Sequence, residues 1–480
     1  MEEIRTKIKG KILRKTVSVC PVCLKRISAD LIQEQDRVYM EKTCREHGDF
    51  KTLIWEGLPD YEGWRNQKVP SAPVQPASQT EKGCPYDCGL CPQHRQHTCC
   101  VLLEVTNRCN LHCPVCFARA GEGTAVKEPS LEEIGTWYDA MMNCGGPFNI
   151  QLSGGEPTMR EDLEEVIRLG KQKGFTFFQL NTNGIRLGED PAYIQKLRLA
   201  GLNCVFLQFD GLREETNRIL RGKPLLEIKK RAIENCRKAG VGVVLVPVIA
   251  KGVNDDEVGE ILKFAWEQMP AVRGVHFQPV SYFGRYEDRK TADRFTLSHL
   301  LQAIEAQTQG RMKMADFKAA GAENAYCSFS GNFMKAEDGS VRPWHDPSSC
   351  GCGSPTAPEP LPVAGVAAKQ AQKFVAKRWS APLTLAPKPT TSCCCEPAPK
   401  AADSCCCDTS SLDRFLARLD TYTLAVSAMA FMDAWNLDLD RLKDCYIHVV
   451  ARKGNVKLIP FCAYNLTATD GTTLYRELPS

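Results

Sequence analysis

The chain has 480 residues, enough for two to four domains, and its 43% hydrophobic and 25% charged residues are ordinary for a globular protein. A net charge of +4 is small for this length, so it does not favour a nucleic acid as a partner. The basic start has no apolar stretch of the kind a secretory signal needs, and the apolar run 424–435 is too short to span a bilayer. We therefore expect a cytoplasmic protein with no membrane span and no nucleic acid partner.

Cysteine usage sets the first functional hypothesis. The chain contains 25 cysteines, far more than a core of this size needs, and many stand at Cys-x2-Cys or Cys-x3-Cys-x2-Cys spacings. Without a secretory signal these spacings favour metal ions or iron–sulfur clusters over disulfide bonds. The sequence therefore indicates thiolate chemistry in a reducing compartment.

The first unit, residues 1–70, carries two pairs of metal-ligand residues. Each pair sits in a short turn, so four ligands can converge on one tetrahedral ion. Zinc is the simpler occupant, and a mononuclear rubredoxin-like iron is the rarer one. The expected role of the ion is structural, and its predicted ligands are Cys20, Cys23, Cys44 and His47.

Residues 71–100 form a linker and a cysteine-bearing segment. The pattern of apolar residues changes after them, and an α/β unit occupies residues 101–300. Apolar runs alternate there with helical patterns, which predicts parallel βαβ units. Six strands fit a partial (β/α)6 TIM-like barrel or a doubly wound sheet, which periodicity alone does not separate. The predicted strands lie near 101–106, 148–152, 175–181, 203–209, 241–249 and 273–279, and the helices near 130–143, 160–173, 190–200, 223–239 and 255–268.

The C-terminal third divides into three parts, which together we expect to form an α+β auxiliary region. A cysteine-containing hairpin region, 301–352, precedes a stretch at 353–410 that is rich in Pro, Ala, Ser and Lys and predicted to be a disordered linker. That linker carries two runs of three cysteines, at 393–395 and 405–407. A compact C-terminal domain, 411–480, follows.

The strongest chemical motif directly follows the first barrel strand. Three cysteines at Cys-x3-Cys-x2-Cys spacing can hold one face of a [4Fe–4S] cube and leave the fourth iron without a protein ligand. Active sites of parallel barrels lie at the carboxyl ends of the strands, where this loop stands. The predicted catalytic and cluster-binding residues are Cys109, Cys113 and Cys116.

These residues and two further strand ends resemble the radical S-adenosylmethionine (SAM) superfamily over residues 101–280. The second strand ends in Ser-Gly-Gly-Glu-Pro-Thr and the third in Asn-Thr-Asn-Gly. The resemblance implies that the open iron chelates SAM and that SAM is split to a 5′-deoxyadenosyl radical. It also implies that the Gly-Gly-Glu-Pro turn binds the methionine amino group and that the third strand faces the ribose and carboxylate. The implied SAM-binding residues are Gly154, Gly155, Glu156, Pro157, Asn181, Thr182 and Asn183.

A second Cys-x3-Cys-x2-Cys motif precedes the first one. It follows no predicted strand, so we interpret it as an auxiliary [4Fe–4S] cluster, with zinc as the alternative. Its predicted ligands are Cys84, Cys88 and Cys91, and the candidates for a fourth are His94, His97, Cys99, Cys100 or a residue from elsewhere in the chain.

The two motifs, together with the N-terminal metal unit, resemble the tetraether lipid synthase and dihydro-hydroxymethylpterin dimethyltransferase group, including the bacterial subgroup of radical SAM (seleno)protein TrsS. The resemblance implies methylation, methylene transfer or C–C coupling at an unactivated C–H bond of a small molecule, lipid or peptide. It also implies a reductase, ferredoxin or flavodoxin as electron donor. The competing hypothesis is a non-catalytic iron–sulfur protein, either an electron carrier or a maturation scaffold.

The remaining cysteines of interest lie at the flanks of two predicted β-hairpins. Asp-Gly and Lys-Gly turns, at 337–340 and 452–455, separate alternating segments and predict β-hairpins with cysteines at their flanks. These cysteines either bind a further cluster or are ordinary buried thiols. They are Cys327, Cys350, Cys352, Cys445 and Cys462.

Overall fold

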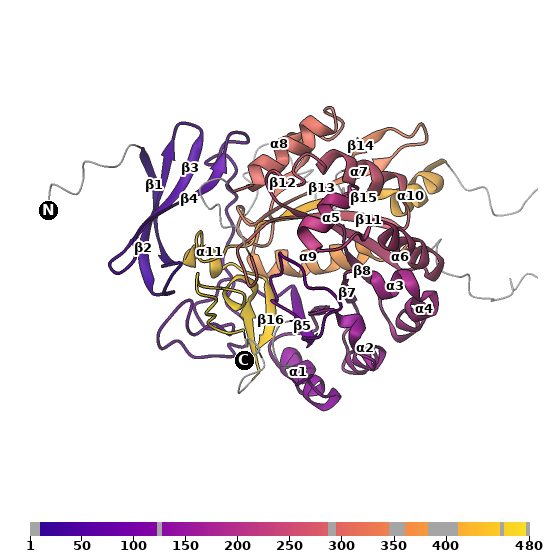
Figure 1. Cartoon of the computed structure of the whole chain (residues 1–480), viewed down its shortest axis with the longest axis horizontal. Helices are drawn as coiled ribbons and strands as arrows, with labels where there is room; N and C mark the ends of the chain where they lie inside the picture. The colour runs from indigo at the N-terminus through magenta and orange to yellow at the C-terminus, as the bar shows by residue number, and fades with distance from the viewer. Residues whose placement is uncertain are drawn as a thin grey trace, which may run out of the picture.

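The computed structural model describes residues 10–121, 127–286, 294–344, 361–382, 411–451 and 456–476. A small antiparallel sheet at the N-terminus lies beside a large mixed sheet that is covered by helices (Figure 1). Cys350 and Cys352 and both runs of three cysteines lie outside the described residues. Within the described ranges, no helix is long and apolar enough to cross a membrane.

The N-terminal sheet is a four-stranded antiparallel meander. Successive strands reverse direction, so the turn after the first strand and the turn after the third lie at the same end of the sheet. Those are the two turns that carry the predicted metal ligands. The strands are β1 (Lys11–Val19), β2 (Arg26–Glu34), β3 (Arg37–Cys44) and β4 (Gly48–Glu56).

Six parallel strands form the central part of the large sheet in strict sequence order, which confirms the partial (β/α)6 barrel and excludes the doubly wound alternative. Valine, leucine and isoleucine side chains on one face of the strands pack against the helices in a single core. The strands are β5 (Cys100–Thr106), β6 (Asn149–Gly154), β7 (Phe178–Thr182), β8 (Cys204–Gln208), β9 (Gly242–Val246) and β11 (Val272–Pro279), with β10 (Val248–Ile249) paired to β11.

The helices lie where the apolar periodicity predicts them, and the first begins with the expected capping box between Ser130 and Glu133. Short helices after β7 and β8 add to the pattern. The helices are α1 (Leu131–Asn143), α2 (Leu163–Gln172), α3 (Ile185–Glu189), α4 (Pro191–Ala200), α5 (Glu214–Arg221), α6 (Leu226–Ala239), α7 (Val258–Glu267) and α8 (Leu297–Gln307), with 3-10 turns η2 (Pro157–Met159) and η4 (Met314–Asp316).

Strands from the C-terminal third extend both edges of the barrel sheet. β15 (Thr423–Met429) pairs parallel to β11, whereas β16 (Ile447–Ala451) pairs parallel to β5 at the opposite edge (Figure 1). The chain between them, 430–446, therefore passes from one edge of the barrel to the other. The predicted boundary at residue 411 remains a prediction, but the strands beyond it share a sheet with the barrel.

The two predicted hairpins are present as antiparallel pairs that continue the sheet at its two ends. The outer strands at the β15 edge are β12 (Lys318–Ala319), β13 (Ser328–Lys335) and β14 (Val341–Pro343), and the outer strand at the β16 edge is β17 (Lys457–Pro460). Short helices accompany them: α10 (Ser411–Thr421), α11 (Leu439–Leu442) and α12 (Phe461–Tyr464).

Part of the expected linker at 353–410 is ordered, which corrects that expectation for one segment. Residues Ala364–Trp379 form α9, and the Trp379 ring packs on the ring of Phe206 at 4.8 Å. The backbone of Trp379 also approaches Gly242 so closely that a Cβ there would lie 2.1 Å from its carbonyl oxygen. Alanine favours a helix, and the concave face of β8 and β9 supplies an apolar surface that the linker composition does not reveal.

Candidate active site

The loop after β5 brings its three cysteines into one pocket. Cys109, Cys113 and Cys116 pack in a small apolar cluster with Leu111 and Leu225. Burial, with the nearby carboxylate of Glu156 and the other two thiols, raises the pKa of Cys109 to about 12. A bare Cys109 thiol therefore stays protonated, and its deprotonation would require a metal to replace the proton.

Two arginines hold the main chain of this loop. Residues Cys116 and Arg285 exchange two backbone hydrogen bonds of 3.1 and 3.0 Å, and Arg285 Nε donates to the Cys113 carbonyl oxygen at 2.7 Å. Arg221 donates to the Val115 carbonyl oxygen at 3.1 Å and is itself paired with buried Asp210 at 2.6 Å. The donors therefore bind carbonyl groups of the loop and fix its path around the three sulfurs.

The Gly-Gly-Glu segment after β6 is joined directly to the start of the cysteine loop. Gly155 N donates to Thr106 O, and Glu156 N donates to Arg108 O, both at 2.8 Å. A Cβ on Gly154 would lie 2.2 Å from Thr106 O, and one on Gly155 would lie 2.2 Å from Arg108 O. Gly154 also has a φ of +118°, which L side chains rarely adopt. The glycines are therefore needed for two strand ends to touch, in addition to any ligand they receive.

Glu156 is buried where three strand ends meet. Its carboxylate accepts hydrogen bonds from the hydroxyls of Thr158 and Thr182, at 2.7 and 2.8 Å, and from Asn183 N at 2.7 Å. Burial nevertheless raises the pKa of Glu156, because these bonds only partly offset its desolvation. Oε1 accepts both hydroxyls, whereas Oε2 accepts the Asn183 N–H and retains capacity for a further donor.

The residues at the end of β7 point in two directions, toward the Glu156 and cysteine-loop side and toward the inner face of the barrel. Thr182 and Asn183 bind inside the protein, because Asn183 Nδ2 also donates to Asn110 Oδ1 of the cysteine loop at 2.7 Å. Asn181 instead accepts from Gln151 Nε2 at 2.9 Å on the inner face of the barrel. Pro157 is buried at the first position of η2, where a missing N–H carries no penalty.

These features fit a [4Fe–4S] cluster with SAM. Three thiols pack in one small cluster, two glycines let the neighbouring turn lie directly against the cysteine loop, and a buried carboxylate lies near Cys109. The three thiols do not form a compact single-ion group of the kind found in the N-terminal sheet. A cubane cluster explains that spread, because each of its thiolate ligands binds a different iron.

The N-terminal sheet brings all four predicted metal ligands together. The ligand atoms of Cys20, Cys23, Cys44 and His47 lie within 4.8 Å of one another, the one such group in the part of the chain that the structure describes. His47 Nδ1 is 3.4 Å from the Cys44 sulfur and 3.6 Å from the Cys20 sulfur. This arrangement suits a tetrahedral ion such as zinc.

The earlier cysteine motif also brings its thiols into contact. The Cys84 thiol is in hydrogen-bond contact with Cys88 and Cys91, and this contact with Cys88 is the main reason that the pKa of Cys84 rises to about 11. Backbone N–H groups of Glu81 and Gly83 bind the Asp87 carboxylate at 2.9 and 2.6 Å and shape the turn. The three predicted ligands are therefore adjacent.

The proposed fourth ligands of that motif are engaged elsewhere. His94 Nε2 lies 2.7 Å from the Cys445 carbonyl oxygen, and His97 Nε2 lies 2.8 Å from Ala72 O. Cys99 is buried with a pKa well above its ordinary value because of desolvation, and Cys100 lies beside Gln151 in the barrel. A fourth protein ligand for this motif remains a prediction.

Three of the C-terminal cysteines meet beside the crossing segment 430–446. The Cys445 thiol interacts electrostatically with those of Cys462 and Cys327, and Arg441 Nη2 donates to the Cys327 sulfur at 3.3 Å. Sequence reasoning missed Arg441, since no motif marks it and its partner is 114 residues away.

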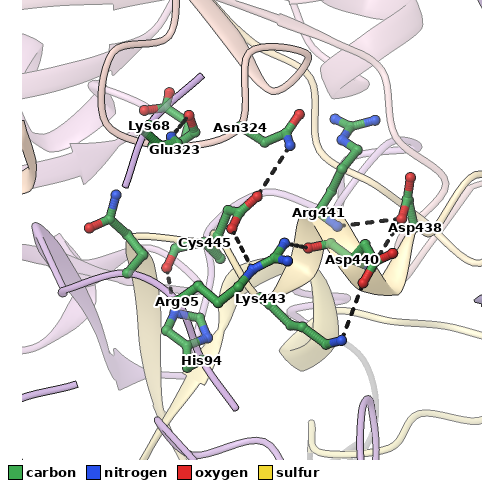
Figure 2. A network of polar contacts seen from close by, with 12 residues as sticks. Lys68, His94, Arg95, Glu323, Asn324, Asp438, Asp440, Arg441, Lys443 and Cys445 are labelled. Atoms are coloured by element: carbon green, nitrogen blue, oxygen red, sulfur yellow. Dashed lines mark hydrogen bonds and ion pairs between the residues drawn. The ribbon is translucent and has the colours of Figure 1, made fainter. Parts of the chain in front are cut away.

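Polar contacts fix this crossing segment to the rest of the molecule (Figure 2). Asp444 accepts from Arg95 Nε at 3.0 Å and from Asn324 Nδ2 at 3.2 Å, while Lys443 pairs with Asp440 at 3.2 Å. Figure 2 shows the His94 ring and the Cys445 backbone beside these contacts. The cysteine group is therefore held by segments from both halves of the chain.

Fold and site together define a radical SAM protein. Residues 103–265 match the Radical SAM superfamily, and residues 12–56 match the HMPTM N-terminal zinc ribbon domain. The predicted superfamily, its [4Fe–4S] cluster and SAM, and the N-terminal metal unit are thereby confirmed.

The chain belongs to the family of the 7,8-dihydro-6-hydroxymethylpterin dimethyltransferase of Methanocaldococcus jannaschii. The two are 36% identical over 97% of this chain and 94% of that protein. A shorter match, 35% identical, joins 30% of this chain to 35% of the Fe-coproporphyrin III synthase of Methanosarcina barkeri. The solved structure of Streptococcus suis SuiB bound to the precursor peptide SuiA matches 45% of this chain and 46% of that one, with 17% identity and a TM-score of 0.37. That TM-score is too low to support an argument.

Proposed function

We propose that the protein reductively cleaves SAM to methionine and a 5′-deoxyadenosyl radical, and that this radical abstracts a hydrogen atom from an unactivated C–H bond of a small polar heterocycle of the pterin class. The carbon that is added there comes from a separate one-carbon donor, a methyl or methylene carrier. The family relationship supports the reaction class, because the relative from Methanocaldococcus jannaschii is named a pterin dimethyltransferase. The observation that carries the substrate class is the chemistry of the inner barrel wall.

The part of that wall formed by β6 and β7 is rich in side-chain amides. Asn181 accepts from Gln151 Nε2 at 2.9 Å and from Gln179 Nε2 at 3.4 Å, and its own amide nitrogen lies 3.5 Å from Ser153 Oγ. Amides both donate and accept hydrogen bonds, as the alternating ring atoms of a pterin do. A lipid tail would instead require a predominantly apolar wall.

The protein side chains have distinct tasks in this proposal. Cys109, Cys113 and Cys116 hold the cluster, which when bound supplies the electron that cleaves SAM. The turn at Gly154 and Gly155 holds Glu156 against the cysteine loop, and the SAM ammonium would bind the free side of the Glu156 carboxylate. A low-potential one-electron donor, such as a reductase, ferredoxin or flavodoxin, restores the cluster.

The remaining cysteine groups complete the proposal. The triad Cys84, Cys88 and Cys91 would hold an auxiliary [4Fe–4S] cluster. Its contacts support this role, because the Cys84 thiol contacts both Cys88 and Cys91 within one turn. A further cluster would be held by the C-terminal cysteines, of which Cys350 and Cys352 lie outside the described residues. This second assignment is supported by the group of Cys327, Cys445 and Cys462 beside Arg441.

The test is anaerobic reconstitution followed by measurement of 5′-deoxyadenosine. We expect 7,8-dihydro-6-hydroxymethylpterin to stimulate its formation and to yield methylated pterin by mass spectrometry, whereas phospholipid vesicles and unrelated peptides should not. Stimulation by the vesicles or peptides alone would overturn the substrate class. Failure to form any 5′-deoxyadenosine in a protein with a full cluster complement would favour the non-catalytic iron–sulfur alternative.

A further inference from the structure

The last described segment, 464–476, lies against both cysteine loops. Tyr475 Oη accepts a hydrogen bond from Cys88 N at 2.9 Å and donates to Pro85 O at 2.6 Å. The next residue, Arg476, reaches the loop of Cys116, because its Nη1 lies 3.5 Å from Ala118 O. Two consecutive residues therefore contact the two motifs that we assign to clusters.

Arg476 is also half of a buried ion pair. Its guanidinium donates to Glu104 Oε1 at 2.6 Å and to Glu104 Oε2 at 3.1 Å, and the two side chains are 4% and 6% exposed. Asn465 Oδ1 accepts from Arg476 Nη2 at 2.6 Å, and Tyr464 Oη donates to Glu104 at 3.0 Å. Both charges are thus fixed in position by hydrogen bonds.

The arginine of the pair lies beside the cysteine loop. The guanidinium carbon lies 5.8 Å from the centre of the ring of Phe117, the residue that follows Cys116. Glu104 belongs to β5, on the barrel side of the pair. Because Arg476 is buried, dissolved salt screens its positive charge poorly. The cysteine loop therefore lies beside a positive charge that salt does not remove.

A buried ion pair adds little stability over an apolar pair, because desolvation of both ions offsets their attraction. Its location therefore calls for another reason. Net charge and hydrogen bonds around an iron–sulfur cluster set the reduction potential of that cluster. A positive charge near the cluster stabilises the reduced cluster and so raises its reduction potential.

We infer that the Glu104–Arg476 pair tunes the reduction potential of the cluster at Cys109, Cys113 and Cys116, and that Tyr475 joins this device to the Cys88 loop. The inference rests on the proposed function, since it requires a cluster at that site. Reduction transfers one electron from a flavodoxin-class donor to the cluster. The pair itself neither gains nor loses a proton or an electron in this step, and Arg476 acts as a positioning residue.

The decisive experiment is an EPR-monitored redox titration of reconstituted full-length protein and three variants. Arg476→Met leaves a negative charge and should lower the potential of the SAM-responsive cluster, identified by the change in its EPR signal when SAM is added. Glu104→Gln leaves a positive charge and should raise that potential. The double variant restores neutrality and should return close to the wild-type value, and it also serves if a single variant fails to fold.

Two further variants separate this role from general packing. Arg273 is another buried arginine, but it binds the carbonyl oxygens of Arg378, Thr421 and Asp420, so Arg273→Met should lower stability without moving either potential. Tyr475→Phe removes the hydroxyl bound to Cys88 N and should change the EPR signal of the cluster that does not respond to SAM.

The possible failures have different signatures. Shifts of equal sign in Arg476→Met and Glu104→Gln, or no shift in either, would overturn the inference while leaving SAM cleavage intact. A wild-type protein that shows no SAM-responsive cluster would overturn the proposed function instead.

Discussion

The N-terminal metal group and the candidate SAM site are both built from cysteines, yet they are assembled in different ways. The first gathers its ligands from two turns at one end of a meander, with Cys20 and His47 only 27 residues apart. The second depends on three strand ends, because the cysteine loop is bonded to segments after β6 and β7. The ligands of the first therefore all come from one small sheet, whereas the second requires three strand ends of the barrel to meet.

The largest expected effect separates the two sites completely. Replacing Cys109, Cys113 and Cys116 with alanine should abolish 5′-deoxyadenosine formation, because no thiolate remains to hold the cluster. Zinc content should be unchanged, since the N-terminal ligands are untouched. Measuring both quantities on the same preparation tests the comparison. Loss of zinc in this variant would mean that the two regions fold as one unit.

The converse variant removes the N-terminal ion. Cys20→Ala with Cys23→Ala should eliminate bound zinc and the folding free energy it supplies, on the order of 10 kcal/mol in isolated zinc-finger peptides. Proteolysis and hydrogen exchange should show the loss in residues 10–56, while 5′-deoxyadenosine is still formed. A complete loss of SAM cleavage would contradict a purely structural role for the ion.

A smaller effect tests the contact between strand ends. Gly155→Ala places a methyl group where Arg108 O is 2.2 Å away, so the cysteine loop must shift. Misplacement by about 1 Å can cost about a hundredfold in rate, and we expect a decrease of that order in SAM cleavage. Gly135→Ala on α1 is the matched control, because its added methyl meets only Leu169 at 3.7 Å. A wild-type rate of SAM cleavage in Gly155→Ala would show that the cysteine loop can shift without affecting the site.

The smallest effect concerns pH. Burial lowers the pKa of His276 to about 4, from an ordinary value of about 6.5, and its Nδ1 lies 2.9 Å from Ser427 Oγ. Between about pH 6.5 and about pH 4, His276 binds a proton in the unfolded chain but stays neutral in the folded protein. The free energy of unfolding should therefore fall by roughly 3 kcal/mol as the pH drops through this range. His276→Gln should flatten this part of the profile in denaturant titrations. If the pH dependence of stability were unchanged in this variant, His276 would have to be able to carry its charge inside the folded barrel.

The site motifs and the elements that bear them were predictable because their signals are local. Apolar periodicity marked β5 through β11, and Ser130 with Glu133 marked the start of α1. Cysteine spacing marked the groups around Cys20, Cys84 and Cys109 in the same way. In each case a few consecutive residues contain the whole pattern, since a strand, a helix cap or a knuckle is decided within one or two turns of chain.

By itself, the sequence determined the positions of the six strands, the three N-terminal and central cysteine groups and the glycines of the Gly-Gly-Glu-Pro turn, whereas the order of the strands in the sheet came from the structure. Only the tertiary structure decided that β15 and β16 extend opposite edges of the barrel, that α9 packs on its concave face, and that Glu104 pairs with Arg476 across 372 residues. Such contacts leave no pattern in neighbouring residues. They form because open sheet edges, apolar surface and a buried charge each require a partner, and the folded chain alone determines which segment is within reach.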